Sequence, residues 1–300
     1  MVIVLKLSII IAAYNAEKFI EDTIRSAISQ TVSDKEIIIV NDGSSDNTLL
    51  VAKKYIGIPG VQVYDLGYNR GAANAYNFGI LHCSGEYVTL LDSDDLYMPT
   101  YAERLLSIME ANQADIGFSN YQAIEGTQMT NMTLYGENRH PKYIYSFGGV
   151  GHTFPNGDSQ AIRKLVLNID GINISPRSIY KRSLFFDYGL DDHRLKISND
   201  WMRNFKFLIN GAKPVYLDEV LGYYRFHPDG NSQKNPLANV VDIVKVFEII
   251  LSELRGYLTD EEVQFMKDQR NTWRNTMFAI LMKLDVTTNQ MARYMLDSGL

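Results

Sequence analysis

The sequence predicts an α/β fold, with a mainly parallel sheet flanked by helices and a helical extension at the C-terminus. Two observations predict this class. In the first 100 residues, apolar runs with the composition of buried strands alternate with amphipathic helical patterns. After about residue 236 the pattern becomes helical. We therefore expect one domain over 1–232, built from halves at about 1–100 and 101–232, and an extension over 233–300.

The first element is predicted as a strand over LSIIIAAY (7–14). The apolar start of the chain is interpreted as this strand rather than as a signal peptide, because no basic segment precedes it and Lys6 interrupts it. Apolar residues spaced i, i+3, i+4 and i+7 predict a helix over 16–30. The continuous run EIIIV (36–40) predicts a strand that is buried on both faces.

The same alternation continues along the chain. Ser and Asp cap signals at the start of SSDNTLLVAKKY (44–55) predict a second helix. Strands are then predicted at 61–66 and 87–91, with a helix between them across about 71–82. A series of this kind produces parallel strands joined by helical crossovers.

The remainder of the chain has two distinct parts. Residues 120–160 are rich in Gly, Asn, Thr and aromatic residues, which predicts long loops or a small antiparallel insert that shapes a binding site. In the extension, Thr259 and Glu262 form a capping-box pattern before a long helix that runs through about residue 284.

The composition is that of a soluble globular protein of 300 residues, 46% hydrophobic and 21% charged. The single cysteine, Cys83, excludes an intrachain disulfide framework and suits a reducing compartment, so we expect the protein in the cytoplasm. The net charge of −6 argues against a nucleic-acid polymer as partner. It leaves a small phosphorylated ligand open, because a metal ion can supply the positive charge.

Four polar clusters each follow a predicted strand directly. They are AYNAE (13–17), NDGSSD (41–46), GYNRG (67–71) and DSDD (92–95). In an open parallel sheet all the carboxyl ends of the strands lie at one edge, which is where ligands bind. The sequence therefore predicts a ligand site at that edge.

The last of these clusters, DSDD, places three aspartates close together at the end of an apolar strand. Asp92 and Asp94 are two residues apart, and in extended chain they would face the same side at about 6–7 Å. Their repulsion, roughly 2–3 kcal/mol at an effective dielectric near 20, is removed by a divalent cation, which prefers carboxylate ligands. The alternative is a surface turn that leads into a helix at Pro99.

Two other clusters also have alternative interpretations. Asp42 stands at a strand end, where its carboxylate could accept a hydrogen bond from a base N–H, whereas Ser45 or Asp46 would cap the following helix. Gly71 permits close backbone approach, and Arg70 could reach a phosphate or be an ordinary loop residue.

Together, the blocks SIIIAAYNAEKFIEDTIRSAISQT, KEIIIVNDGSSDNT, NRGAANAYNFGI and GEYVTLLDSDD resemble, in this order, the family 2 inverting glycosyltransferases with the Rossmann-like GT-A fold. The resemblance covers about the first 100 residues closely and about 170–232 more loosely. It implies a nucleotide-diphosphate sugar as donor, usually uridine-linked, with Mn²⁺ or Mg²⁺ as cofactor. The two halves of the domain would then be a donor-binding half and an acceptor-side half.

The resemblance also implies roles for individual residues. Ala13, Tyr14 and Glu17 would line the base and ribose pocket, Asp42 would contact uracil, and Asp92 and Asp94 would be the DxD pair. Asp95 is expected only to begin the turn. The implied donor-binding residues are Ala13, Tyr14, Glu17, Asp42, Arg70, Asp92, Ser93 and Arg225; the implied metal ligands are Asp94 and His227, with Asp92 as a further candidate.

The catalytic base that the resemblance implies is Asp200, within KISNDWMRNF. It would deprotonate the acceptor hydroxyl as that hydroxyl attacks the anomeric carbon. Asn199 stands where the family usually has Glu, and the alternative is that Asp200 only caps the helix that follows. Similarly, His227 in YYRFHPDGNS is either a metal ligand or structural, and Arg225 could pair with the diphosphate.

The segment 171–186 corresponds to the part of the family that faces the acceptor. Arg177, Tyr180 and Trp201 are the implied acceptor residues. The aromatic face of Tyr180 would suit the C–H faces of sugars, although such aromatic residues can equally belong to the core. The expected acceptor is a glycan or lipid-linked hydroxyl, in cell-surface polysaccharide biosynthesis. The expected enzyme is a hexosyl- or N-acetylhexosaminyl-transferase.

Two alternatives stay open at this point. A sugar nucleotidyltransferase would need a Gly-rich, Lys-bearing loop after the first strand, and AAYNAEKF lacks glycine. A glycan- or nucleotide-binding module without full catalytic power is favoured only by Asn199. The C-terminal helices are a candidate contact for a homo-oligomer, and attachment at the inner face of the membrane is a further possibility for a protein that acts on lipid-linked acceptors.

Overall fold

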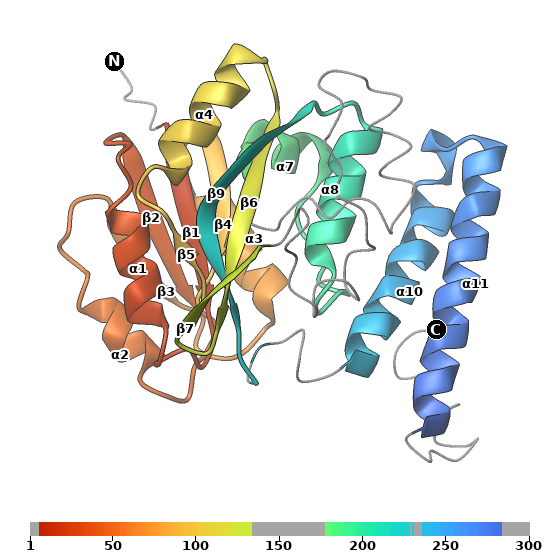
Figure 1. Ribbon diagram of the computed structural model, residues 1–300, viewed down its shortest axis with the longest axis horizontal. Coiled ribbons are helices and arrows are strands. Elements are labelled where there is room, and N and C mark those ends of the chain that lie inside the picture. The colour runs from red at the N-terminus through yellow and green to blue at the C-terminus, as the bar shows by residue number, and fades with distance from the viewer. Residues whose placement is uncertain (1–5, 134–177, 229, 231–235, 284–300) are drawn as a thin grey trace. The chain divides into compact units, whose positions relative to one another are not determined.

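The computed structural model describes residues 6–133, 178–228, 230 and 236–283 (Figure 1). Its contacts divide the chain into two compact units. The sheet unit comprises Met1–His193 and Arg203–Phe226, and the C-terminal unit comprises Arg194–Met202 and His227–Leu300. The sequence predicts a division near residue 232. It gives no indication that the segment 194–202 groups with the C-terminal helices.

The first half of the sheet has the predicted parallel order. Its strands β3, β2, β1 and β4 are neighbours in that order and all run parallel. The apolar runs that predict them form β1 (Leu7–Ala13), β2 (Lys35–Asn41), β3 (Val61–Asp65) and β4 (Tyr87–Asp92). Every residue of β1 except Ala12 is buried, as expected for a strand covered on both faces.

The second half continues the same sheet in the order β8, β6, β9 and β5, and β7 pairs with β6. β8 is antiparallel to both β4 and β6, β9 is parallel to β6, and β5 is antiparallel to β9. These strands are β5 (Leu96–Tyr97), β6 (Ile116–Glu125), β7 (Gln128–Thr133), β8 (Ile179–Lys181) and β9 (Pro214–Phe226). The fold class is therefore α/β with a mixed, mainly parallel sheet, as predicted.

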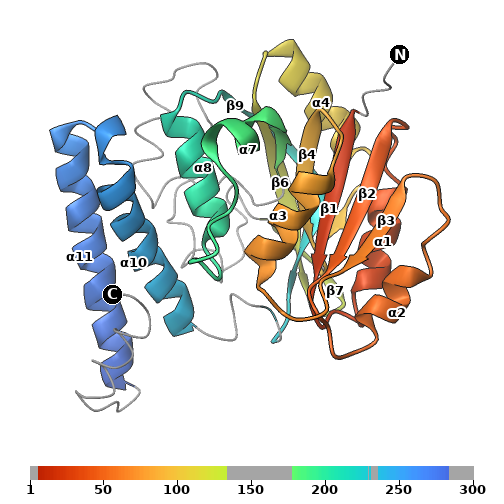
Figure 2. The same cartoon turned by 180° about the vertical axis from the view of Figure 1, so that it is seen from behind.

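Helices cover both faces of this sheet. α1, α2 and α4 lie on one face (Figure 1), and α3 lies on the other (Figure 2). A Cβ placed on Gly79 of α3 would come within 2.3 Å of Ile10 Cγ2, so this helix packs directly on β1. The helices of the unit are α1 (Ile20–Ile28), α2 (Thr48–Lys53), α3 (Ala72–His82), α4 (Tyr101–Ala111) and α7 (Ser183–Tyr188). α8 (Asn199–Ile209) begins in the C-terminal unit and ends in the sheet unit.

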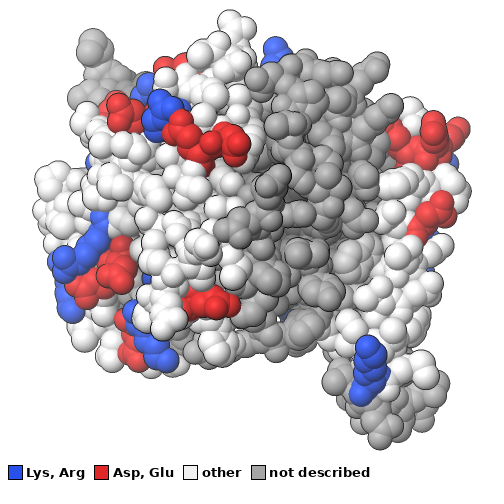
Figure 3. Space-filling model, in the orientation of Figure 1, with Lys and Arg blue, Asp and Glu red and all other residues white. Residues whose placement is uncertain are grey.

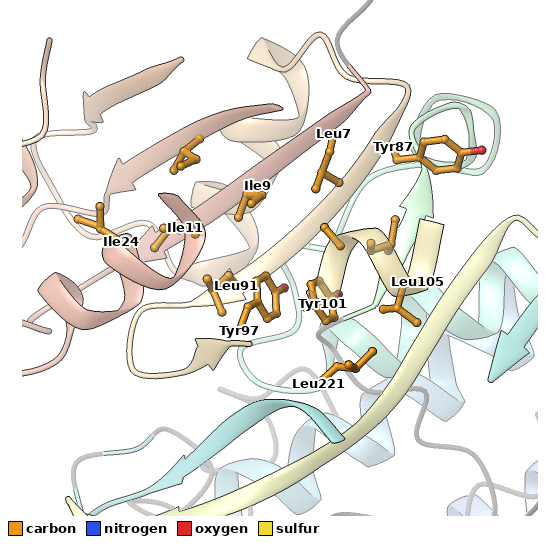
Figure 4. Packing of buried hydrophobic residues seen from close by; sticks show 14 of the residues in the cluster. Leu7, Ile9, Ile11, Ile24, Tyr87, Leu91, Tyr97, Tyr101, Leu105 and Leu221 are labelled. Atoms are coloured by element: carbon orange, nitrogen blue, oxygen red, sulfur yellow. The ribbon is translucent and has the colours of Figure 1, made fainter. Parts of the chain in front are cut away.

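The core between the sheet and the α1–α4 face follows from strand alternation. Ile9 and Ile11 belong to the buried cluster that also holds Ile24 of α1, Leu91 of β4 and Leu105 of α4 (Figure 4). Full burial of one such aliphatic side chain stabilises the fold by about 1.5–3 kcal/mol. This cluster fixes α1 against the end of β4, where the aspartates lie.

Two elements differ from the sequence prediction. The first helix begins at Ile20 rather than at 16, because the Ala16 carbonyl accepts the N–H groups of both Phe19 and Ile20 and a turn precedes the helix. The antiparallel insert expected within 120–160 is present as the β6–β7 pair, but β6 is also a buried central strand. Residues 134–177 lie outside the described residues.

In the C-terminal unit, α10 (Pro236–Glu253) and α11 (Asp260–Lys283) lie side by side, joined through a short 3₁₀ helix, Arg255–Tyr257 (Figure 1). Val240, Val241, Met277 and Leu281 form the buried cluster between them. The predicted capping box is confirmed: Thr259 N–H donates to Glu262 Oε2 at 2.7 Å, and Glu262 N–H donates to Thr259 Oγ1 at 3.2 Å.

Basic and acidic side chains are interspersed over the described part of the face that Figure 3 shows. Exposed ion pairs of the sheet unit include Lys6–Glu110 at 2.6 Å and Arg25–Glu21 at 2.8 Å. Pairs of this kind contribute about 0–1 kcal/mol each. Within the described ranges, no helix is long and apolar enough to cross a membrane.

Candidate functional site

The predicted meeting of four polar clusters at one edge of the sheet is confirmed by the strand register. Ala13 of β1 pairs with Asn41 of β2, Asn41 pairs with Asp65 of β3, and Ala12 pairs with Asp92 of β4. The four loops therefore begin at the same level. Hydrogen bonds from Asn41 Nδ2 at 2.8 Å and Gly67 N–H at 3.1 Å hold the pKa of Asp65 below its usual value.

The loops after β1 and β2 are bonded to each other. Asn15, which has a φ of +48°, donates its N–H to Ser44 Oγ at 3.0 Å and accepts the Ser45 N–H on Oδ1 at 2.9 Å. Ala16 N–H donates to Thr48 Oγ1 at 2.7 Å. These three hydrogen bonds join two segments that are about 30 residues apart in the sequence, and they fix the loops after β1 and β2 against each other.

Glu17 and Asp46 complete this body at the start of α2. Glu17 Oε2 accepts the Asn47 N–H at 3.0 Å and the Asn47 side-chain amide at 2.9 Å. The N-cap of α2 is Asn47 rather than Ser45 or Asp46, but Asp46 Oδ1 accepts the N–H of Thr48, the first residue of the helix, at 2.9 Å. Burial opposes the charge of Asp46, but its hydrogen bonds with Thr48 and Glu17 hold its pKa below the usual value. Both carboxylates therefore anchor the loop to α2.

Asp42 connects the end of β2 to the start of α3. The side chain is buried, and its two oxygens accept the N–H groups of Arg70 and Gly71, each at 2.8 Å. These N–H groups directly precede α3, so the carboxylate also satisfies helix-terminal donors. A carboxylate offers about four acceptor positions. Two backbone bonds therefore leave capacity for a base N–H.

Gly43 lies against the loop that Asp42 holds. Its φ is +67°, and an added Cβ would come within 2.4 Å of the backbone of Tyr68. We expect Gly43→Ala to displace this loop and to lower the free energy of unfolding by about 1–3 kcal/mol in urea titrations. Gly57→Ala is the matched control, because Gly57 also has a positive φ, +102°, but nothing lies within 4 Å of its added Cβ. Equal losses in the two variants would contradict a specific contact with the loop.

The DSDD segment is a turn rather than extended chain. β4 ends at Asp92, residues 93 and 94 form a turn, and Asp95 N–H donates to the Asp92 carbonyl at 3.2 Å. The expectation that Asp92 and Asp94 share one side of an extended strand is therefore wrong. Asp95 is buried and accepts the Arg225 N–H on Oδ1 at 2.8 Å, which agrees with a structural role in the turn.

Three elements hold this turn from different sides. From α1, the Thr23 hydroxyl lies 2.9 Å from the carbonyls of both Ser93 and Asp95. From α3, the Tyr76 hydroxyl donates to Asp92 Oδ1 at 2.6 Å. From β9, Arg225 Nε donates to the Asp94 carbonyl at 2.9 Å. The turn is thus preorganised, which is what a ligand site needs.

Arg225 is a cationic residue that contacts this turn directly. Its guanidinium also donates to the Gly126 carbonyl and lies over the Phe19 ring, 4.9 Å from the centroid. Burial lowers its pKa, while the nearby carboxylates of Asp94 and Asp22 raise it. Arg225 therefore supports the aspartate turn through the backbone of Asp94, a role that the sequence does not reveal.

Asp92 and Asp94 have the chemistry that a hard divalent cation requires. Both carboxylates are half-buried, and each belongs to a turn that is fixed by its neighbours. Mg²⁺ in phosphate-transfer sites is usually held by one or two carboxylates together with the phosphates of the substrate. Within the described residues, no group of three or more His, Cys, Asp or Glu side chains is placed to hold a metal on its own. The residues present thus fit a metal that the donor helps to bind.

Two exposed tyrosines flank the edge. Tyr14 follows β1 and is 49% exposed, and Tyr68 follows β3 and is 62% exposed. The Arg70 guanidinium lies over the Tyr68 ring, 4.3 Å from its centroid. Exposed aromatic rings beside a cation can stack on a base while the cation approaches phosphate.

Three of the predicted residues, Asp200, Trp201 and His227, lie in the C-terminal unit. Asp200 is half-buried in the first turn of α8, and Trp201 is also half-buried. Asn199 donates its side-chain amide to the Leu195 carbonyl at 2.7 Å, a bond that a Glu carboxylate could not donate. Asn199, which stands where the family usually has Glu, therefore closes the chain turn that precedes Asp200.

His227, the other predicted residue of this unit, is buried.

The acceptor residues are placed differently from the prediction. Tyr180 is fully buried, its hydroxyl donates to Asn204 Oδ1 at 3.0 Å, and its ring packs edge-to-face on Phe185 and Phe207. It belongs to the core of the sheet unit and presents no face to a sugar. Arg177 lies outside the described residues. The sequence does not identify Thr23 or Tyr76 as site residues, because nothing in their neighbourhood distinguishes them from ordinary helix residues.

Known proteins resemble this chain in sequence and in fold. The family model described as Glycosyl transferase family 2 matches residues 8–189. Glycosyltransferase GlyA of Streptococcus pneumoniae serotype 4 is 30% identical over 226 residues, which is 73% of this chain, and the chain spans 30% of GlyA.

Two solved structures share the fold. S. aureus TarS 1–349 in complex with UDP-GlcNAc has a TM-score of 0.67 at 20% identity, covering 95% of this chain and 77% of that structure. Mannosyltransferase PcManGT from Pyrobaculum calidifontis, in complex with GDP-Man and Mn²⁺, has a TM-score of 0.63 at 15% identity, covering 98% and 79%. At these identities the likeness shows the architecture alone.

Proposed function

The chain belongs to glycosyl transferase family 2, and from this premise we propose that it is a metal-dependent inverting glycosyltransferase. Its donor would be a nucleotide-diphosphate sugar, with a UDP-sugar favoured. The observation that carries the proposal is the Asp92–Asp95 turn, which α1, α3 and β9 hold at the carboxyl edge of the parallel strands. Ligands of open α/β sheets bind at this edge.

Two comparisons support the donor class and the cofactor. TarS has been solved with UDP-GlcNAc, and PcManGT with GDP-Man and Mn²⁺. In this chain, Asp94, with Asp92 as a second ligand, would hold Mn²⁺ or Mg²⁺. When bound, the ion would neutralise charge on the donor diphosphate. A hexosyl or N-acetylhexosaminyl group would be transferred to a hydroxyl of a glycan or lipid-linked acceptor in cell-surface polysaccharide biosynthesis.

The nucleoside would be bound by the loops after β1, β2 and β3. Asp42 has acceptor capacity for a base N–H, and the exposed rings of Tyr14 and Tyr68 offer faces for stacking. Arg70, beside Tyr68, would approach the phosphates. The hydrogen bonds among these loops would fix their conformation before the donor binds, which reduces the conformational entropy lost on binding.

The proposed chemistry is a single displacement at the anomeric carbon. The acceptor oxygen attacks from the face opposite the leaving diphosphate, a new C–O bond forms, and the bond from the anomeric carbon to the phosphate oxygen breaks. Asp200 accepts the proton of the acceptor hydroxyl, and the nucleoside diphosphate leaves with the bonding electrons. The configuration at the anomeric carbon is inverted.

Calorimetric titration with UDP, with and without Mn²⁺, tests the donor site. We expect Mn²⁺-dependent binding to the wild type and its loss in Asp94→Ala, because the variant removes a metal ligand. Asp187→Ala, at an exposed position of α7, removes an equal charge elsewhere and should bind as the wild type does. Absence of UDP binding under every condition would contradict the proposal that the donor is a UDP-sugar. GDP and TDP would then be titrated. UDP binding that is unchanged by a chelator would overturn the metal dependence.

A further inference from the structure

A buried aspartate interrupts the apolar helix α10. Asp242 is 2% exposed and lies between Val241 and Ile243, which are also buried. A buried carboxylate is costly unless its charge is met by hydrogen bonds or by an opposite charge. The contacts of Asp242 therefore indicate its structural role.

One oxygen of Asp242 faces three successive backbone donors. Oδ2 accepts the N–H groups of Lys196 at 2.5 Å and Ile197 at 2.6 Å, and the N–H of Ser198 lies at 3.4 Å. Successive N–H groups that converge on one anion form an anion-binding concavity, and hydrogen bonds to an ionised acceptor are about twice as strong as neutral ones. All of these residues belong to the C-terminal unit. Asp242 thus fixes the course of the chain over 196–198.

The segment that Asp242 fixes leads directly into the first turn of α8. Asn199 follows Ser198 and donates its side-chain amide back to the Leu195 carbonyl at 2.7 Å, while Met202 N–H donates to the Ser198 carbonyl at 3.3 Å. The turn that carries Asp200 is therefore held both by α10 and by its own local bonds.

We propose that Asp242 is a positioning residue for the glycosyl transfer reaction: by anchoring 196–198 it sets the direction of the first turn of α8 and so places Asp200. The proposal rests on the proposed function, in which Asp200 is the base. It assigns the helical extension a part in catalysis, because the extension supplies the anchor of the segment that bears the base. It also explains why the segment Arg194–Met202 groups with the C-terminal helices.

A neighbouring contact provides the matched control. Arg194 forms an ion pair with Glu253, Nη1 to Oε1, at 2.6 Å, and so also joins this segment to α10. Both side chains are about half exposed, at 45% and 51%, so solvent screens the pair. Replacing Glu253 removes a carboxylate from the same helix but leaves the acceptor of the N–H groups of 196–198 in place.

The test compares Asp242→Ala, Asp242→Asn and Glu253→Ala with the wild type by two readouts. The first is the steady-state release of UDP from UDP-GlcNAc, or of GDP from GDP-Man. The second is amide hydrogen exchange of peptides that cover 196–198. We expect Asp242→Ala to lower kcat by about 10- to 100-fold, the scale of a misplaced catalytic group, with the donor KM within about twofold. Exchange at 196–198 should accelerate about tenfold or more, because an ionised acceptor is lost from these amides. Asp242→Asn should be intermediate, and Glu253→Ala should match the wild type.

The outcomes separate the two proposals. A wild type that binds none of UDP, GDP and TDP and releases no nucleotide from either donor would overturn the proposed function, and the exchange data would then still show whether Asp242 anchors 196–198. Wild-type kcat in Asp242→Ala would overturn the positioning role, as would a fall in kcat that accompanies loss of UDP binding or accelerated exchange throughout the chain. A lower kcat with donor binding intact and exchange altered only around 196–198 supports the role, because an effect on stability alone would not produce this combination.

Discussion

Replacing Asp200 by Asn is expected to lower kcat by about 10²- to 10⁴-fold, the range over which a positioned general base contributes. The amide keeps the size of the side chain and its place in the first turn of α8, but it cannot accept the proton of the acceptor hydroxyl. UDP binding should remain close to that of the wild type, because the proposed nucleotide contacts belong to the loops of the sheet unit. Steady-state kinetics with the donor that supports turnover, together with UDP titration, would measure both effects.

Asp260→Asn is the appropriate control for this substitution. Asp260 also occupies the first turn of a helix in the C-terminal unit, α11, and it is exposed. Both variants lose the same favourable interaction of a negative charge with a helix N-terminus, about 0.3–1 kcal/mol. Asp260→Asn therefore controls for the loss of a charge at a helix N-terminus, and we expect no loss of activity in this variant. If Asp200→Asn kept full activity, another group would have to accept the proton, and Asp200 would be a capping residue.

The second large effect is expected at the buried ion pair of Arg203 and Asp191. The guanidinium binds the carboxylate through two bonds, Nε to Oδ1 at 2.8 Å and Nη2 to Oδ2 at 2.6 Å, and both side chains are almost fully buried. Burial disfavours the charge of Arg203, but Asp191 and Tyr180 raise the pKa of Arg203 above its usual value. Asn77 of α3 also binds the Asp191 backbone through two hydrogen bonds, at 2.8 and 2.9 Å.

Asp191→Ala should therefore destabilise the sheet unit by about 3–5 kcal/mol, because it leaves a buried guanidinium without its partner. Cys83 provides a local probe of unfolding: it is buried in the same unit, and burial raises the pKa of its thiol to about 11, which suppresses reaction with thiol reagents in the folded state. Labelling of Cys83 in increasing urea would give the midpoint for each variant.

Two further variants check the cause of this destabilisation. Glu219→Ala breaks the exposed pair with Arg104 and should cost only about 0–1 kcal/mol. The double variant Asp191→Leu/Arg203→Met removes both charges and should recover much of the stability lost by Asp191→Ala, since buried pairs can often be replaced by apolar residues. A loss of less than about 1 kcal/mol in Asp191→Ala would show that water reaches the guanidinium and that the pair is not desolvated as described.

Local pattern determined the first half of the sheet. The runs at 7–14, 36–40, 61–66 and 87–91 are short and rich in apolar residues, and each is bounded by polar residues or glycine. Composition and period therefore suffice to predict parallel strands and their common edge. The same holds for the capping box of Thr259 and Glu262, since both partners lie within one turn. The positions of the four polar clusters after their strands therefore suffice to predict that they meet at one edge of the sheet.

The second half of the sheet could not be predicted in this way. β6 contains Gly117, Ser119 and Asn120, which interrupt an apolar pattern, and it is stabilised by pairing with β8 and β9, strands that lie about 60 and 100 residues further along the chain. From the sequence alone, Tyr180 could equally stack on a sugar or belong to the core. Only its packing against Phe185 and Phe207 decides for the core.

The sequence by itself determined which chemical groups are present, namely the carboxylates after β4 and that of Asp200. It also determined their order along the chain, on which the resemblance to the family depends. Only the tertiary structure decided how these groups are held. The turn at 92–95 depends on Thr23, Tyr76 and Arg225. The segment 196–198 depends on Asp242, whose contacts with it span 44 to 46 residues of sequence. The physical reason is that a residue's type and its neighbours in sequence fix its local propensity, whereas burial and hydrogen-bond partners are set by residues that meet only when the chain folds.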